Sequence, residues 1–262
     1  MTSEPDVLNL NIICPPPGEG GVEAHPIVNG RHLLTDVLAE SPESPGYVPV
    51  GPRPLLDPDG PLHATATPHE IRVAVSGCGV ELCCGALYVT VRRDGEHVLW
   101  EGWRDLAHPE FDAPGLRFAA AAYEAEVLRA EADRGWEWPG AAVARLLEAG
   151  LNRREDWLDR WDCEVEGVWA SRSEPDRIRV VLGHPRGLTD PDRPWIQFGL
   201  TLPISEDDPS DQAARLEAEL TAGDPRATAE VWGGTYHADQ LGYPWPPVNP
   251  WRSEDPEEAP SR

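Results

Sequence analysis

The stretch from Ala86 to Trp103, ALYVTVRRDGEHVLWEGW, constrains the fold most strongly, because it carries a complete β-hairpin pattern. Asp94-Gly95 lies between two apolar runs whose side chains alternate, which is typical of two strands joined by a tight turn. The sequence therefore predicts strands over 86–93 and 96–103. A two-residue turn at Asp94-Gly95 would place four apolar side chains together on the buried face, with Val89 opposite Trp100 and Val91 opposite Val98.

Two more strands are expected in the N-terminal half. Residues 7–13 and 70–76 alternate apolar and polar side chains, and we expect them to join the hairpin in one antiparallel sheet. Asn29-Gly30 is a second turn pattern, after which residues 31–37 could return as a strand or as a helix. Residues 41–62 are rich in Pro, Gly and Asp and indicate a surface loop.

The C-terminal half alternates helical and strand patterns. In the first helix the stripe of Tyr123, Val127 and Ala130 should be buried. The acidic side chains should point outward: Glu124, Glu126, Glu131 and Asp133. Helices are expected over 119–134, from Pro139 to about Leu151, over 154–161, from Asp208-Pro209 to Gly223, and briefly from Asp224-Pro225 to Trp232. Strands are expected over 164–171, 178–183 and 195–204.

Together these elements predict the α+β class, with antiparallel sheet(s), several packed helices and a disordered C-terminal tail. We expect a single domain over residues 1–242, with a subdivision near 110–160 as the alternative. Residues 243–262 are rich in Pro and charge, which predicts a flexible acidic tail.

The charge of the chain restricts its partners. The 262 residues carry a formal net charge of −24, from 46 acidic and 22 basic side chains. Nucleic acid and anionic membranes would be repelled by such a protein, so neither is an expected partner. A basic protein would be attracted. All 22 of the basic side chains counted are arginine, a bias typical of genes from high-G+C bacteria.

The expected location is the cytoplasm. The N-terminal residues MTSEPDVLNL are acidic and lack the apolar region of a secretion signal. No apolar run approaches the roughly 18 residues that span a bilayer. Five cysteines without an export signal indicate reduced thiols.

Three cysteines, Cys78, Cys83 and Cys84, lie in a glycine-rich loop just before the hairpin. Zinc needs four donors and favours thiolates, and four residues separate Cys78 from Cys83, a spacing found in zinc sites. Cys83 and Cys84 would point to opposite faces of a strand, so both are not expected to bind one ion, and His63 or His69 could supply a fourth donor. The three interpretations are a tight structural turn, a zinc site and a redox pair. The first is favoured, so no cofactor is expected, and zinc is the alternative.

The segment CGVELCCGALYVTV, followed by VLWEGW and FAAAAYEAEV, resembles a family of uncharacterised proteins from high-G+C bacteria. Its members tend to have a C-x-C-G-x-x-x-C loop that enters a hairpin, and later a helix that starts with F-x-x-x-x-Y. Cys78, Gly79 and Cys83 match the loop, and Phe118 and Tyr123 match the helix start. Ser76 stands where the family often has its first cysteine. The resemblance covers about residues 70–130 and implies no known activity.

Catalytic patterns are scarce in this sequence. No nucleophile motif surrounds a Cys or Ser, and no phosphate-binding glycine motif precedes a helix. His184 and His108 each precede a proline and indicate surface or capping residues. We therefore expect a non-catalytic interaction protein, with immunity- or antitoxin-like binding of a basic partner as one form. The alternative is a small metal- or redox-active protein or enzyme that uses Cys78 and Cys83, and a protein without enzymatic activity is favoured over it.

Overall fold

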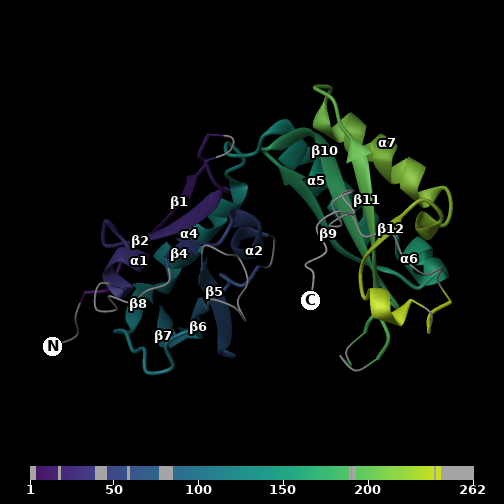
Figure 1. Cartoon of the computed structure of the whole chain (residues 1–262). Helices are drawn as coiled ribbons and strands as arrows, with labels where there is room; N and C mark the ends of the chain where they lie inside the picture. The colour runs from purple at the N-terminus through teal and green to yellow at the C-terminus, as the bar shows by residue number, and fades with distance from the viewer. Residues whose placement is uncertain are drawn as a thin grey trace, which may run out of the picture. The chain divides into compact units, whose positions relative to one another are not determined.

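The computed structural model describes residues 4–16, 19–38, 46–57, 60–76, 85–188, 190, 193–238 and 240–242. The chain forms two compact units, residues 1–136 and 137–262, which we call unit 1 and unit 2 (Figure 1). Their boundary lies within the range 110–160 that the sequence offers for a subdivision. The fold is mixed α+β with antiparallel sheets, as predicted. The expected tail over 243–262 lies outside the described residues.

Unit 1 contains a five-stranded sheet with the order β4-β5-β6-β7-β8 and a three-stranded sheet with the order β1-β2-β3. The expectation that residues 7–13 join the hairpin sheet is wrong, because β1 pairs with β2, a strand that the sequence analysis missed. The strand bounds are β1 Leu8–Ile13, β2 Glu23–Val28, β3 Arg31–His32, β4 Tyr47–Pro49, β5 His69–Ser76, β6 Ala86–Asp94, β7 His97–Asp105 and β8 Leu116–Ala119.

The predicted hairpin is present as β6 and β7, but its register differs by two residues. The turn residues are Gly95 and Glu96, so Asp94 pairs with His97 and Val91 pairs with Trp100. Gly95 has φ +57° whereas the φ of Glu96 is not positive, which is the sign pattern of a type II′ turn with glycine first. A shift of two residues keeps each side chain on its predicted face. Val89, Val91, Val98 and Trp100 are accordingly all buried.

We expect Gly95→Val to lower the free energy of unfolding by about 1–3 kcal/mol, the cost of holding a non-glycine residue in a sparsely populated positive-φ conformation. A Cβ at Gly95 would meet no atom within 4 Å, so the cost would come from the backbone alone. Urea unfolding of the two proteins measures the difference. Gly95→Asn is the matched control and should lose less, because asparagine tolerates positive φ. Equal stability of the Val variant and the parent would contradict this turn geometry.

Two regions of unit 1 carry more structure than their composition suggests. Asn29 and Gly30 have φ values of +52° and +79° and make the predicted turn, after which the chain returns first as β3 and then as helix α1, Leu33–Val37. The prediction of a loop throughout 41–62 is wrong, since β4 and helix α2, Pro52–Leu56, lie there. Proline at the first position of α2 starts the helix, and Leu55 and Leu56 are buried in the core.

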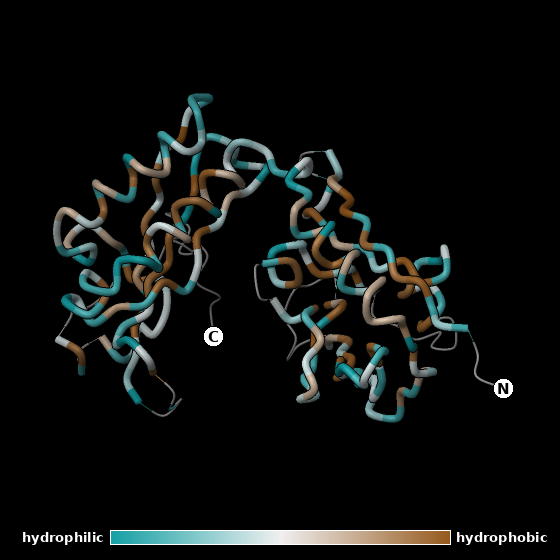
Figure 2. The backbone as a smooth tube through the Cα atoms, turned by 180° about the vertical axis from the view of Figure 1, so that it is seen from behind, coloured by the Kyte–Doolittle hydropathy of each residue, from teal (hydrophilic) through white to brown (hydrophobic). Residues whose placement is uncertain are grey.

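Helix α4, Ala120–Ala132, covers the core of unit 1 with the predicted stripe of Tyr123, Val127 and Ala130. Hydrophobic residues follow the interior strands of this unit (Figure 2). The two sheets are linked by backbone hydrogen bonds at both sides, from Asp6 N to Arg117 O at 2.7 Å and from Ala24 N to Val50 O at 2.8 Å.

The prediction that Glu126 and Glu131 point outward is wrong. The Oε1 atom of Glu126 accepts a hydrogen bond from Leu10 N on β1 at 2.6 Å, and the Nη2 atom of Arg129 donates to Leu10 O at 2.8 Å. Glu131 pairs with His63, with 2.5 Å between Oε1 and Nε2. These contacts bury helix carboxylates because backbone and side-chain partners of unit 1 satisfy them.

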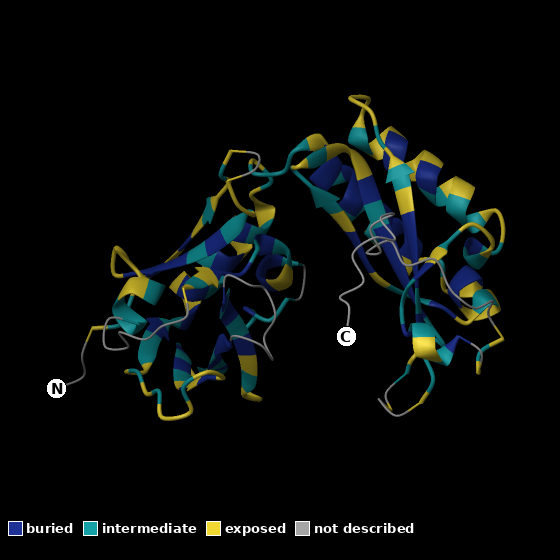
Figure 3. Cartoon of the chain, in the orientation of Figure 1, coloured by how far each residue is buried: buried dark blue, intermediate teal, exposed yellow. Residues whose placement is uncertain are grey.

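Unit 2 is a four-stranded sheet with the order β12-β11-β10-β9, packed against helices. One face carries Ile178, Val180, Leu182, Ile196 and Phe198, which form a core with the helices. Figure 3 shows how buried and exposed residues alternate along α7. The bounds are α5 Pro139–Asn152, α6 Glu155–Trp161, β9 Glu164–Ser171, β10 Glu174–His184, β11 Ile196–Pro203, α7 Pro209–Thr221, β12 Glu230–Gly233, and 3-10 turns at Pro225–Ala227 and Thr235–His237.

The sequence predicted most elements of unit 2. Asp208 caps α7 as expected, because its Oδ1 atom accepts from Ser210 N at 2.9 Å and from Asp211 N at 3.2 Å. The helix expected from Asp224 to Trp232 is only a 3-10 turn, and the chain then continues as strand β12. On the opposite edge of the sheet, Val168 N of β9 donates to the Oε2 atom of Glu148 on α5 at 2.9 Å.

Candidate functional site

The face of the unit 2 sheet opposite the helices has a floor of glycine residues. A Cβ atom at Gly199 would lie 1.9 Å from the indole of Trp232, and one at Gly167 would lie 2.6 Å from the indole of Trp169. Both rings therefore lie flat on backbone that only glycine can provide. Four strand glycines meet side chains in this way: Gly167 under Trp169, Gly183 under Glu166, Gly199 under Trp232 and Gly233 under Gln197.

The two tryptophan rings flank a valine on β10. Val181 pairs with Gly167 on one side and with Gly199 on the other. Trp169 and Trp232 cover those two glycines, so Val181 lies between the rings and is only 5% exposed. Trp169 itself is 49% exposed. We call Trp169, Val181 and Trp232 the apolar platform.

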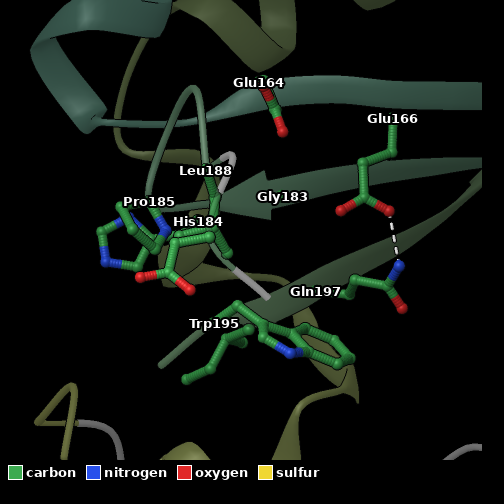
Figure 4. A pocket seen from close by; sticks show the side chains of 10 residues that line it. Glu164, Glu166, Gly183, His184, Pro185, Leu188, Trp195 and Gln197 are labelled. Atoms are coloured by element: carbon green, nitrogen blue, oxygen red, sulfur yellow. Dashed lines mark hydrogen bonds between the residues drawn. The ribbon is translucent and has the colours of Figure 1, made fainter. Parts of the chain in front are cut away.

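A pocket of about 520 Å³ opens in the next row of the same sheet. This row contains Glu164, Gly183, Gln197 and Gly233, which pair across the four strands. Figure 4 shows the carboxylates of Glu164 and Glu166 reaching from β9 toward the space that Trp195 bounds on the other side. The lining is completed by His184, Pro185, Leu188, Asp190 and Ile196.

The pocket is acidic. Glu164, Glu166 and Asp190 line it, and none of its described lining residues is an arginine. Burial of the carboxylate end raises the pKa of Glu166 above its ordinary value, although the residue as a whole is exposed. The hydrogen bond that Gln197 Nε2 donates to Glu166 opposes this rise in pKa, and the negative charge of Glu164 adds to it. A cation in the pocket would relieve this repulsion between carboxylates.

The walls of the pocket are held in place by hydrogen bonds and ring contacts. The Nδ1 atom of His184 lies 2.7 Å from Asp162 O, where α6 ends with Asp162 at φ +51°. Trp195 N donates to the Nδ1 atom of His237 at 3.1 Å. The indole of Trp195 meets the rings of His237 and Tyr236 edge to face, at centroid distances of 6.0 and 6.4 Å. These contacts orient the Trp195 ring, which we call the aromatic wall of the pocket.

None of the described residues that line this pocket belongs to the metal site that the sequence suggests. Cys78, Cys83 and Cys84 lie outside the described residues. The Nε2 atom of His69 lies 2.7 Å from Pro61 O, and His63 pairs with Glu131, so both histidines have partners in unit 1. Within the described ranges, no group of three or more His, Cys, Asp or Glu side chains could hold a metal ion.

His184 was expected to be a surface or capping residue. It does cap the carbonyl of Asp162, but its side chain is only 12% exposed and it lines the pocket. Sequence reasoning therefore missed its place in the site.

Comparisons of the chain with protein-family models, curated proteins and solved structures find no match. The class of the molecule therefore rests on its own architecture: two α+β units, one of which carries an acidic pocket beside an apolar platform. Among the residues that the structure describes, no helix has the length and apolar character needed to cross a membrane.

Proposed function

We propose that this protein is a non-catalytic interaction protein whose unit 2 pocket binds a cationic group of a basic protein. Immunity- or antitoxin-like binding is one form that this function could take. The observation that carries the proposal is the combination of three carboxylates and the Trp195 ring around one space of about 520 Å³. Carboxylates attract a cation, and the face of an indole adds cation–π attraction.

The overall charge of the chain supports the same partner. A net charge of −24 would accelerate the encounter with a basic protein over a long range. Such steering does not by itself select a binding mode, because it acts on any basic partner. The pocket supplies the local contact that the overall charge lacks.

A binding measurement with a matched charge control tests the proposal. The probe is a fluorescent triarginine peptide, and its anisotropy is followed with the full chain at physiological ionic strength, which screens long-range attraction. We expect E164Q/E166Q to weaken binding by about tenfold, or about 1.4 kcal/mol. The control E206Q/E219Q removes two exposed charges of unit 2 that do not line the pocket, and it should change affinity much less. Equal losses in both variants would contradict a pocket for cations.

The raised pKa of Glu166 predicts a pH dependence. A carboxylate with a raised pKa takes up its proton at a higher pH. As the pH is lowered, the affinity for the probe should therefore begin to fall before the pH reaches 4.5, the ordinary pKa of glutamate. The other titratable side chains that line the pocket are His184, Glu164 and Asp190.

Comparison with Glu166→Gln isolates the contribution of Glu166 to this pH dependence. That variant should bind the triarginine probe more weakly at neutral pH, and its affinity should change less with acidification than that of the parent. If the parent and the variant had parallel pH profiles, the assignment to Glu166 would be wrong.

A further inference from the structure

We propose that the pocket and the apolar platform together recognise an extended segment of the basic partner that contains arginine. In this arrangement the arginine enters the pocket, and an apolar side chain two residues away lies on the platform. The inference rests on the proposed function and specifies the chemistry of its partner.

The pocket and the apolar platform are spaced like two side chains of one extended peptide. Val181 of the platform and Gly183 of the pocket floor are two residues apart on β10, which places the two rows roughly 6.4–6.8 Å apart. Side chains at positions i and i+2 of an extended peptide have the same separation and point to the same side. One extended segment can therefore reach both features without bending.

The platform presents a flat apolar surface. Trp169 and Trp232 lie flat on glycine, so this part of the sheet offers ring surface rather than projecting side chains. A flat apolar surface suits an extended segment that lays one side chain across it. Trp169, which is 49% exposed, leaves ring area available for that contact.

The carboxylates and the aromatic ring of the pocket favour arginine over lysine. A guanidinium group is planar, can donate to two carboxylates at once and stacks on an aromatic ring. Glu164 and Glu166 offer the carboxylates from one strand, and Trp195 offers the ring. A lysine ammonium is a compact, strongly hydrated charge and gains less from this planar arrangement.

Short peptides test the inference with the full chain. The probes are acetylated, amidated pentapeptides: Gly-Arg-Gly-Leu-Gly, Gly-Arg-Leu-Gly-Gly, Gly-Arg-Gly-Gly-Gly and Gly-Lys-Gly-Leu-Gly. Dissociation constants come from NMR titrations that follow the tryptophan indole signals. We expect the first peptide to bind at least about threefold more tightly than each of the others, because only it satisfies both features with the preferred cation.

A variant of the platform separates this inference from the proposed function. Trp169→Ala removes an exposed ring and should abolish the advantage of Gly-Arg-Gly-Leu-Gly over Gly-Arg-Gly-Gly-Gly, while the latter still binds. Equal binding of all three arginine peptides, or an unchanged advantage in Trp169→Ala, would overturn the inference but leave the cation pocket intact. Failure of every arginine peptide to bind, or to respond to E164Q/E166Q, would overturn the proposed function as well.

Discussion

Replacement of Trp100 by alanine is expected to lower the free energy of unfolding by about 3–5 kcal/mol, the cost typical of removing a large aromatic side chain from a core. Trp100 is fully buried between the sheet and α4 of unit 1. Its ring meets Phe118 and Tyr123 at centroid distances of 5.6 and 6.3 Å. Its Nε1 atom donates to the hydroxyl of Tyr123 at 3.2 Å, and that hydroxyl donates to Leu62 O at 2.9 Å.

The loss in the Trp100 variant would therefore combine a cavity with a broken chain of hydrogen bonds. Urea unfolding followed by circular dichroism measures it. Trp169→Ala is the matched control, since it removes the same kind of side chain from an exposed position of unit 2 and should cost far less. Trp100→Phe should fall between the two, because it keeps part of the volume but loses the donor. Similar losses for Trp100→Ala and Trp169→Ala would contradict the described core.

Gly234→Ala should also be strongly destabilising and should disturb the aromatic wall of the pocket. A Cβ at Gly234 would lie 2.1 Å from the backbone oxygen of Trp195, which cannot rotate away as a side-chain tip could. Gly234 has φ +67°, a conformation that favours glycine. We expect a loss of about 1–3 kcal/mol from overpacking, in addition to the cost of positive φ.

Gly187→Ala separates these two contributions. Gly187 has the same φ of +67°, but a Cβ there would meet no atom within 4 Å. Its alanine variant should therefore show the backbone cost alone. Thermal or urea unfolding of both variants gives the difference, and the indole NMR signals report the position of Trp195. If Gly234→Ala were no less stable than Gly187→Ala, the close packing of Trp195 against this turn would be refuted.

The sequence predicted the hairpin faces but not its register, and the reason lies in the turn. Asp94-Gly95 and Gly95-Glu96 are both two-residue turns that keep the apolar side chains on one face. The choice between them depends on where glycine is needed, and in the structure Gly95 is the first turn residue with φ +57°. Alternation alone cannot distinguish two registers that differ by an even number of residues.

Strand β2 was missed for a related reason. In Glu23–Val28 a histidine and a proline interrupt the apolar residues, so no clean alternation is visible, and the strand conformation comes from pairing with β1. The boundary between the two sheets of unit 1 could not be predicted either, because contacts such as that of Asp6 with Arg117 join segments far apart in the chain. Tertiary pairing of this kind overrides local propensity.

The candidate site could not be assembled from the sequence, although one signal for it was present. Gly167, Gly183 and Gly199 interrupt three strands that otherwise have good strand patterns, and glycine inside a strand often marks the close approach of another group. What the sequence does not contain is the pairing that brings these glycines into adjacent rows. The cysteines of the loop are close together in the sequence, whereas the pocket combines residues from separate strands and loops.

The contacts of Glu126 with Leu10 and of Glu148 with Val168 have a consequence for association between copies of this chain. Exposed edge strands present unpaired N–H groups that can template pairing with a strand from another molecule, and many proteins discourage this with lysine at the edge. This chain contains no lysine. Near the middle of β1 and of β9, a glutamate from a neighbouring helix instead occupies the outward N–H group. A strand that pairs with β1 or β9 would have to displace a charge-assisted hydrogen bond, which disfavours β-association through these two edges.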